Sequence, residues 1–142
     1  MLVFLITLAV TPYISNSWYF TFPKDDYISQ RKLYNYKTIK FIQALNLKDN
    51  INILEAEGGI NVYLGPQFRW VPEYEKKESF FHYLDKRKIN AILSTDNLVN
   101  DLRFRNDTEW REFFTDYQQY GFSKYAIPDT DRAIYVKKSS LP

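Results

Sequence analysis

Cysteine is absent from this chain of 142 residues, and histidine occurs once, at position 82. Without cysteine the chain has no disulfide framework, no thiolate metal site and no cysteine nucleophile. With one histidine and no cysteine, the chain also lacks the usual ligands of a zinc ion. His82 lies on a predicted helix whose apolar stripe includes Phe80 and Leu84, and we therefore expect its imidazole to face solvent.

Several functional signatures are missing as well. The pair Gly58-Gly59 belongs neither to a G-x-x-x-x-G-K-[ST] sequence nor to a G-x-G-x-x-G sequence, so it predicts a turn and no phosphate loop. No G-x-S-x-G sequence supplies a serine nucleophile. The formal net charge is only +2 and no arginine-rich run occurs, which argues against a nucleic-acid partner. We accordingly predict no catalytic residue, no cofactor and no bound metal in this chain.

The residues that are present have the composition of one folded domain. Hydrophobic residues make up 45% and charged residues 25% of the sequence, as in globular proteins. Apolar runs and turn residues predict strands at 51–54, 68–71, 89–93, 122–127 and 132–136, and helices at 36–45, 75–88, 97–102 and 106–120. The alternation predicts a single three-layer α/β domain over residues 24–142, with a mostly parallel sheet and an antiparallel C-terminal hairpin. An apolar N-terminal helix precedes this domain, and residues 25–35 are predicted to be a linker.

The stretch 50–65, NINILEAEGGINVYLG, holds the first candidate site. An apolar strand reaches the carboxylates of Glu55 and Glu57 and then breaks at Gly58-Gly59. Ligands of open α/β sheets sit at the carboxyl ends of strands, and residues two apart on a strand share a face. Glu55 to Gly59 could therefore bind a cation or a sugar hydroxyl, although a solvated strand exit would contain the same residues.

A second candidate site follows the central strand. Ser94, Thr95 and Asp96 come directly after the run INAIL, again at a strand end where ligands bind. Helix capping by the same side chains is the more economical interpretation. The run Lys86-Arg87-Lys88 stands at a predicted helix end, where cations suit the helix dipole and could also meet lipid head groups.

Residues 1–14, MLVFLITLAVTPYI, are apolar and uncharged. At about 1.5 Å per residue they would cross about two-thirds of a hydrocarbon core of ~30 Å. Aromatic residues follow at 18–22 and charges at 24–26, which is typical of a segment that leaves a membrane. We predict that residues 1–23 are the end of a membrane-spanning or membrane-proximal helix. The alternative is a hydrophobic helix that packs on the domain.

Taken together, these segments have a familiar order. It comprises an aromatic membrane exit, a helix, the runs ILEAEGG and NVYLG, a helix before INAILST, an amphipathic WREFF helix, YGF and a closing AIYVKK strand. Over residues 2–138 this order resembles the soluble C-terminal domain of polytopic GT-C membrane glycosyltransferases, the relatives of protein mannosyltransferases and of the aminoarabinose transferase.

The resemblance implies an extracytoplasmic, periplasmic domain that lies on the transmembrane part of a parent enzyme using a polyprenyl-phosphate-linked sugar. The catalytic acid of that family lies among helices outside this chain, so the fragment should be inactive by itself. The basic residues after the apolar run would by themselves favour the cytoplasmic side. Two other functions stay open: a stand-alone α/β module that binds a small polar ligand at Glu55–Gly59 and at Ser94 and Asp96, and a membrane-anchored interaction protein with an aromatic surface.

Overall fold

The structure is a computed structural model that describes residues 26–48, 50–55, 60–71 and 73–142. The side chains of residues 26–32, 61, 62, 70, 96 and 97 are not part of this description. The apolar helix and the membrane segment predicted within residues 1–23 lie outside the described residues. No helix in the described ranges is both long enough and apolar enough to cross a membrane. Tyr34–Pro142 form one compact unit.

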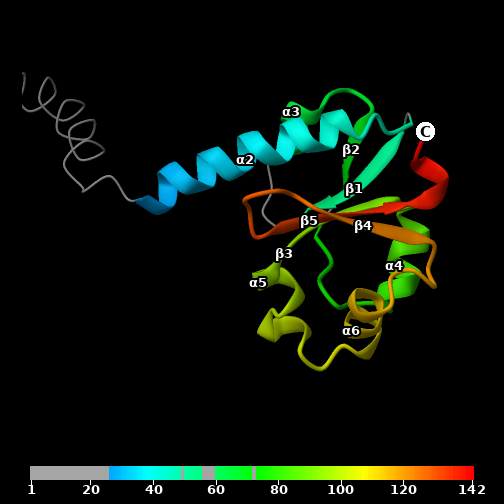
Figure 1. Cartoon of the computed structure of the whole chain (residues 1–142). Helices are drawn as coiled ribbons and strands as arrows, with labels where there is room; N and C mark the ends of the chain where they lie inside the picture. The colour runs from blue at the N-terminus through cyan, green and yellow to red at the C-terminus, as the bar shows by residue number, and fades with distance from the viewer. Residues whose placement is uncertain (1–25, 49, 56–59, 72) are drawn as a thin grey trace, which may run out of the picture. The chain divides into compact units, whose positions relative to one another are not determined.

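A mixed sheet occupies the middle of this unit, with the strand order β2-β1-β3-β5-β4 (Figure 1). Its strands are β1 (Ile51–Glu55), β2 (Phe68–Val71), β3 (Ala91–Thr95), β4 (Phe122–Ala126) and β5 (Arg132–Lys137). β1 pairs in parallel with β2 and β3, whereas β5 runs antiparallel to β3 and β4. The predicted α/β class and the C-terminal hairpin are confirmed. The sheet is mixed rather than mostly parallel because β5 joins the central strand in the opposite direction.

Helices cover both faces of the sheet. They are α2 (Asp26–Ala44), α3 (Asn61–Leu64), α4 (Phe80–Lys86), α5 (Asp96–Val99) and α6 (Thr108–Thr115), with 3-10 turns η1 (Leu102–Phe104) and η2 (Lys138–Ser140). α2 and α3 lie on one side of the sheet, and α4 and α6 on the other (Figure 1). Apolar residues of these helices explain the arrangement, because those of α4 and α6 pack in the core on one side of the sheet and those of α2 and α3 in the core on the other.

The two faces of the sheet bury different kinds of core. On the side of α4 and α6 the core is aromatic and includes Phe80, Trp110, Phe113 and Tyr135. On the side of α2 and α3 it is aliphatic and includes Ile42, Ile51, Ile53, Leu64, Leu93 and Ile134. All five residues of β3 are buried because this strand has neighbours on both edges and helices on both faces.

Helix α2 is longer than predicted, and the predicted linker at 25–35 is wrong from Asp26 onward. The polar residues between Asp26 and Asn35 include no glycine or proline, and several of them are good helix formers. Polarity was therefore a poor sign of a linker here. Ile42, an apolar residue within the helix predicted at 36–45, is buried.

Helix α4 begins at Phe80, later than the predicted start at residue 75. Its N-cap is Ser79, whose hydroxyl accepts a hydrogen bond from the backbone N–H of His82 at 3.3 Å. Lys76 has a φ of 57°, in the left-handed region, so a right-handed helix cannot run through it. His82 is exposed, as predicted.

The end of the central strand and the next helix also differ from the prediction. β3 extends to Thr95 because Ser94 and Thr95 continue the antiparallel ladder with β5. The helix predicted at 97–102 is divided into α5 and η1. α6 starts at Thr108 after its N-cap Asp107, close to the predicted start at 106, but it ends at Thr115 rather than at 120. Gly121, at a φ of 77°, instead forms the turn that leads into β4.

Candidate functional site

The carboxyl ends of β1, β2 and β3 lie side by side along one edge of the sheet that runs across the strand ends, and β5 begins at the same edge. We refer to it as the carboxyl edge. Glu55 is paired with Leu93, and Arg132 with Thr95. Cross-strand partners share a face, and Leu93 belongs to the core beneath α2. Glu55, Thr95 and Arg132 therefore all point to the side of the sheet that α2 covers.

Among the described residues, Glu55 is the one predicted site residue with a buried carboxylate. It is 3% exposed, and its Oε1 accepts a hydrogen bond from the backbone N–H of Ile60 at 2.8 Å. The bond joins the end of β1 to the start of the α3 segment across residues 56–59. Predicted candidates Glu57, Gly58 and Gly59 lie outside the described residues.

Arg132 is a buried charged residue that the sequence analysis did not single out. Its side chain is 5% exposed, and its Nη1 donates to the Oδ1 of Asn35 at 2.7 Å and to the Oγ1 of Thr38 at 3.2 Å. Thr38 is itself fully buried. The arginine thus connects the first residue of β5 with helix α2. The available signal was its position next to the apolar run AIYV, where a cation must find partners if it is buried.

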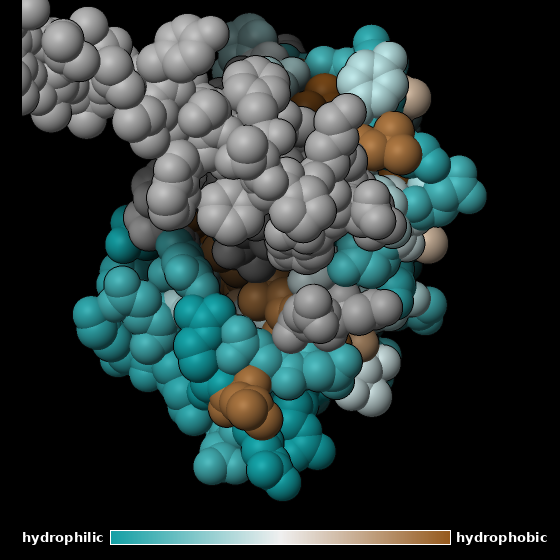
Figure 2. All heavy atoms as spheres, turned by 90° about the vertical axis from the view of Figure 1, so that its left-hand side faces the viewer, coloured by the Kyte–Doolittle hydropathy of each residue, from teal (hydrophilic) through white to brown (hydrophobic). Residues whose placement is uncertain are grey.

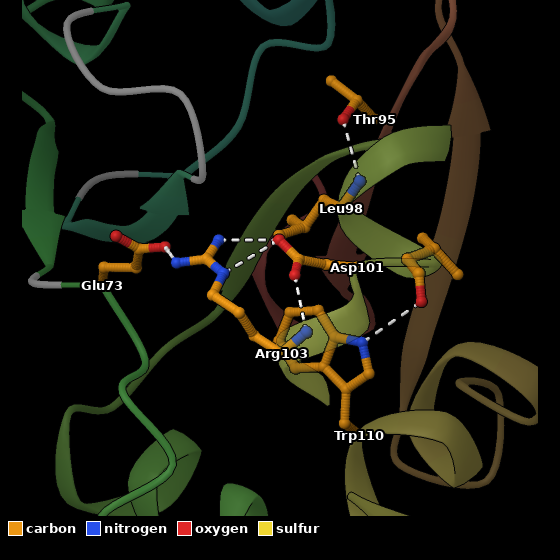
Figure 3. A network of polar contacts seen from close by, with 7 residues as sticks. Glu73, Thr95, Leu98, Asp101, Arg103 and Trp110 are labelled. Carbon is orange, nitrogen blue, oxygen red and sulfur yellow. Dashed lines mark hydrogen bonds and ion pairs between the residues drawn. The ribbon is translucent and has the colours of Figure 1, made fainter. Parts of the chain in front are cut away.

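Ser94 and Thr95 use their hydroxyls inside the fold. Ser94 donates to the backbone carbonyl of Ala133 at 3.3 Å, and it points to the opposite side of the sheet from Thr95. Thr95 Oγ1 accepts from the backbone N–H of Leu98 at 3.1 Å, which satisfies a free N–H of α5 (Figure 3). The capping interpretation is therefore confirmed for Thr95. Asp96 opens α5, but its side chain is not among those described.

An ion-pair network lies beside this edge, on the side of α5 and η1 (Figure 3). Arg103 donates to Glu73 at 2.8 Å, and through Nη2 and Nε to Asp101 Oδ2 at 2.8 and 3.0 Å. Hydrogen bonds from Arg103 hold the pKa of the Asp101 carboxyl below its usual range. The pKa of Arg103 is raised, first by its bond to Asp101 and then by its bond to Glu73. The network ties the segment after β2 to the segment after β3.

Next to this network, at Glu73, lies a shallow hollow with a cavity volume of about 10 Å³, room for roughly one water molecule. Its lining is almost entirely apolar and comprises Leu54, Glu73, Tyr74, Leu98, Phe104 and Trp110. Sites for drug-sized ligands occupy roughly 300–1,000 Å³. The hollow is therefore too small to hold such a ligand as the structure stands.

The Tyr74 hydroxyl, which belongs to the aromatic core, is held by polar groups. It lies 2.7 Å from Oδ2 of Asp107 and 3.0 Å from the carbonyl oxygen of Glu78. Burial, followed by the bond to Asp107, raises the pKa of Tyr74 well above its usual value. The hydroxyl thus remains a neutral donor, and Asp107 uses its other oxygen to accept the backbone N–H of Trp110 at 3.1 Å.

The arrangement as a whole consists of polar groups that bind neighbouring segments of the same chain. In the described ranges, no group of three or more acidic or histidine side chains could hold a metal ion. The described atoms on the side of the molecule shown in Figure 2 are mostly hydrophilic, and the hydrophobic ones form small separate groups.

Neither a protein-family model, nor a curated protein, nor a solved structure matches the chain. The resemblance to membrane glycosyltransferases therefore stays a prediction from the sequence.

Proposed function

We propose that residues 24–142 form the extracytoplasmic accessory domain of a membrane glycosyltransferase that uses a polyprenyl-phosphate-linked sugar. In this proposal residues 1–23 end a membrane helix, and the domain lies on the periplasmic side, against the transmembrane part of its parent enzyme. The transfer chemistry belongs to that transmembrane part, and the fragment is inactive by itself. The role of the domain is to hold a fixed surface next to the acceptor.

The attachment of α2 to the sheet is the observation that supports this proposal. α2 is the element through which the chain enters the α/β unit, and a domain that must keep a fixed position needs a firm connection there. Arg132 binds Asn35 and Thr38, and Lys37 forms an ion pair with Asp129 at 3.0 Å. Together with the buried Ile42 and the partly buried Ile39 and Phe41 of α2, these bonds join the helix to β5 and to the hairpin turn.

The polar groups at the carboxyl edge fit the same role. Glu55 fastens the start of the α3 segment, Thr95 caps α5, and Arg132 fastens α2. Each of these side chains therefore positions a segment that surrounds the edge. Such bonds make a rigid surface, and rigid surfaces lose little entropy when they contact a partner.

The reading frame upstream of Met1 provides the first test. We expect further apolar spans there, with an acidic residue in the first loop outside the membrane, and a stop codon directly before Met1 would contradict the proposal. The second test is labelling of the parent enzyme with a membrane-impermeant maleimide after Ser139→Cys, because this chain has no cysteine of its own. Labelling in intact cells is expected, with the parent lacking the substitution as control. Labelling that requires permeabilised cells would place the domain on the other side.

A second candidate is a stand-alone module that binds a small polar ligand at the carboxyl edge. The burial of two charged residues, Glu55 and Arg132, at strand ends on the same face favours it, since ligands of α/β sheets occupy that position. Its test is a screen of glycans and nucleotides with the full chain, followed by Glu55→Gln and Asp96→Ala. A ligand whose binding survives both substitutions would exclude this site.

A further inference from the structure

The opposite edge of the sheet gathers basic side chains from four separate segments. We refer to it as the amino edge, because β1, β2 and β3 begin there; it lies on the side of the C-terminus in Figure 1. Its cations are Lys48, Arg69, Arg87, Lys88, Lys137 and Lys138. Lys137 is partly buried, and the other five are exposed.

Backbone and amide hydrogen bonds keep these segments together. The Asn52 amide donates to the carbonyls of Arg87 and Lys88 at 3.1 and 3.0 Å. The N–H of Lys137 donates to the carbonyl of Asn90 at 2.8 Å. Lys48 donates through its backbone to the carbonyl of Ser140 at 3.0 Å. The basic residues are thus held along one edge by the fold, although they are far apart in the sequence.

The cations at this edge are gathered in one place with few acidic residues among them. Elsewhere in the domain Lys37, Lys77 and Arg103 form ion pairs with carboxylates, as does Lys86 next to Arg87. Other exposed cations, namely Lys76, Arg105, Arg111 and Lys124, form no ion pair among the described residues. Within the described part of the chain, none of the six amino-edge cations forms an ion pair. In the described segments 46–48, 50–52, 67–69, 85–90 and 136–139, Asp85 is the acidic residue, and the sequence adds Asp49, which lies outside the described residues. The edge therefore carries a local excess of positive charge in a chain whose net charge is only +2.

We propose that the amino edge binds a linear acidic polysaccharide, a sugar chain with repeated carboxylate, sulfate or phosphate groups. A row of lysine and arginine side chains suits such a polymer, since mobile ammonium groups can meet anions at variable spacing. The proposal rests on the proposed function in one respect, because it makes the partner an acidic acceptor glycan.

Two observations favour a glycan over other polyanions. The large hydrophobic residues that are exposed in the described structure are Leu33, Tyr36, Tyr63 and Leu102, and none of them belongs to the amino-edge segments. Single-stranded nucleic acids are usually bound by cations interleaved with exposed aromatic platforms. In addition, Asn35 and Thr38 of α2 bind Arg132 at the carboxyl edge, so the chain enters the unit at the end opposite to the amino edge. The basic row thus lies at the far end of the unit from Asn35 and Thr38.

The test compares two variants of equal charge in the full chain, purified in a neutral detergent. The first combines Lys48→Gln, Arg87→Gln, Lys88→Gln and Lys138→Gln; the control combines Lys76→Gln, Arg105→Gln, Arg111→Gln and Lys124→Gln, which are exposed cations elsewhere. Binding of labelled alginate and labelled heparin is measured by fluorescence anisotropy. We expect the amino-edge variant to bind at least about tenfold more weakly, and the control to stay within about threefold of the original chain.

Salt provides a second measurement. If four cations contact the polymer, raising the salt from 50 to 200 mM should weaken binding on the order of fiftyfold, by analogy with counterion release from single strands. The amino-edge variant should lose most of this dependence. A smaller variant, Arg87→Gln with Lys88→Gln, keeps the comparison valid if the larger one does not fold.

Equal weakening by the two four-charge variants would overturn the proposal, because net charge would then explain binding. Binding of a DNA duplex or of phosphatidylglycerol vesicles as tightly as alginate at the same salt would overturn the choice of a glycan. Polysaccharide binding does not require an upstream membrane region. A stop codon before Met1 with intact alginate binding would therefore refute the proposed function alone.

Discussion

Asp107 offers the sharpest test of how this domain is held together. Its carboxylate, 8% exposed, accepts the N–H of Trp110 with one oxygen and the Tyr74 hydroxyl with the other. Removal of an N-cap costs about 1 kcal/mol, and loss of a hydrogen bond to a charged group costs about 1.5–3 kcal/mol. The carbonyl of Glu78 at 3.0 Å can still accept from Tyr74, which reduces the second cost. We expect Asp107→Ala to lower the free energy of unfolding by about 2–3 kcal/mol.

Asp107→Asn is the matched variant. An asparagine oxygen can keep the cap to Trp110, and its amide N–H can donate to the Tyr74 hydroxyl while that hydroxyl donates to Glu78. We therefore expect a loss below about 1 kcal/mol, since asparagine caps helices as well as aspartate does. The measurement is urea unfolding of the full chain in neutral detergent, followed by tryptophan fluorescence and circular dichroism.

A double-mutant cycle with Tyr74→Phe isolates the hydrogen bond between the two side chains. We expect a coupling energy of about 1 kcal/mol, within the usual range for residues in contact. Asp116→Ala, an exposed aspartate at the other end of α6, is the surface control and should change stability by less than about 0.5 kcal/mol. Equal losses for Asp107→Ala and Asp107→Asn would refute the reasoning, because they would show that charge rather than hydrogen bonding matters at this position.

Further predictions concern other contacts. Hydrogen bonds from Ser79 and from the N–H of Phe81 lower the folded-state pKa of Glu109. The stability that Glu109 contributes is therefore present above its unfolded pKa of about 4.3 and is lost as pH falls through the lower folded pKa. The difference in unfolding free energy between the original chain and Glu109→Gln, measured by urea unfolding, should narrow below about pH 4. Arg132→Met should cost at least about 2 kcal/mol of unfolding free energy, because it removes charge-assisted bonds to α2. Gly121→Ala should cost about 1–2 kcal/mol in the same assay through its left-handed backbone alone, since a Cβ there meets open space, and Gly121→Asn should cost less.

Much of the fold could be predicted from local pattern, and the errors have a common cause. β1, β5 and α6 have clear signals: branched apolar runs for the strands, and an Asp cap with aromatic spacing for the helix. The start of α2 and the cap of α4 were missed because polar residues serve equally well in loops and on exposed helix faces. Tertiary contacts decide between these states. For α4 the outcome is visible in the backbone of Lys76, whose positive φ stops a helix from running through it.

The sequence predicted the position of the candidate site better than the residues that form it. The carboxyl ends of strands pointed to Glu55 and Ser94, and the structure brings the ends of their strands, β1 and β3, to the same edge of the sheet. Arg132 was missed because β5 runs antiparallel to β3, which brings its first residue to the edge where β3 ends. No local pattern around Arg132 contains that information, since the partners Asn35 and Thr38 are more than 90 residues earlier in the chain.

The strand order has a consequence for synthesis. β5 lies between β3 and β4, so the last strand in the sequence occupies an interior place. Before β5 has emerged from the ribosome, β3 lacks a partner on one side. β4 then has no neighbouring strand at all. The described sheet can therefore be completed only after β5 has left the ribosome.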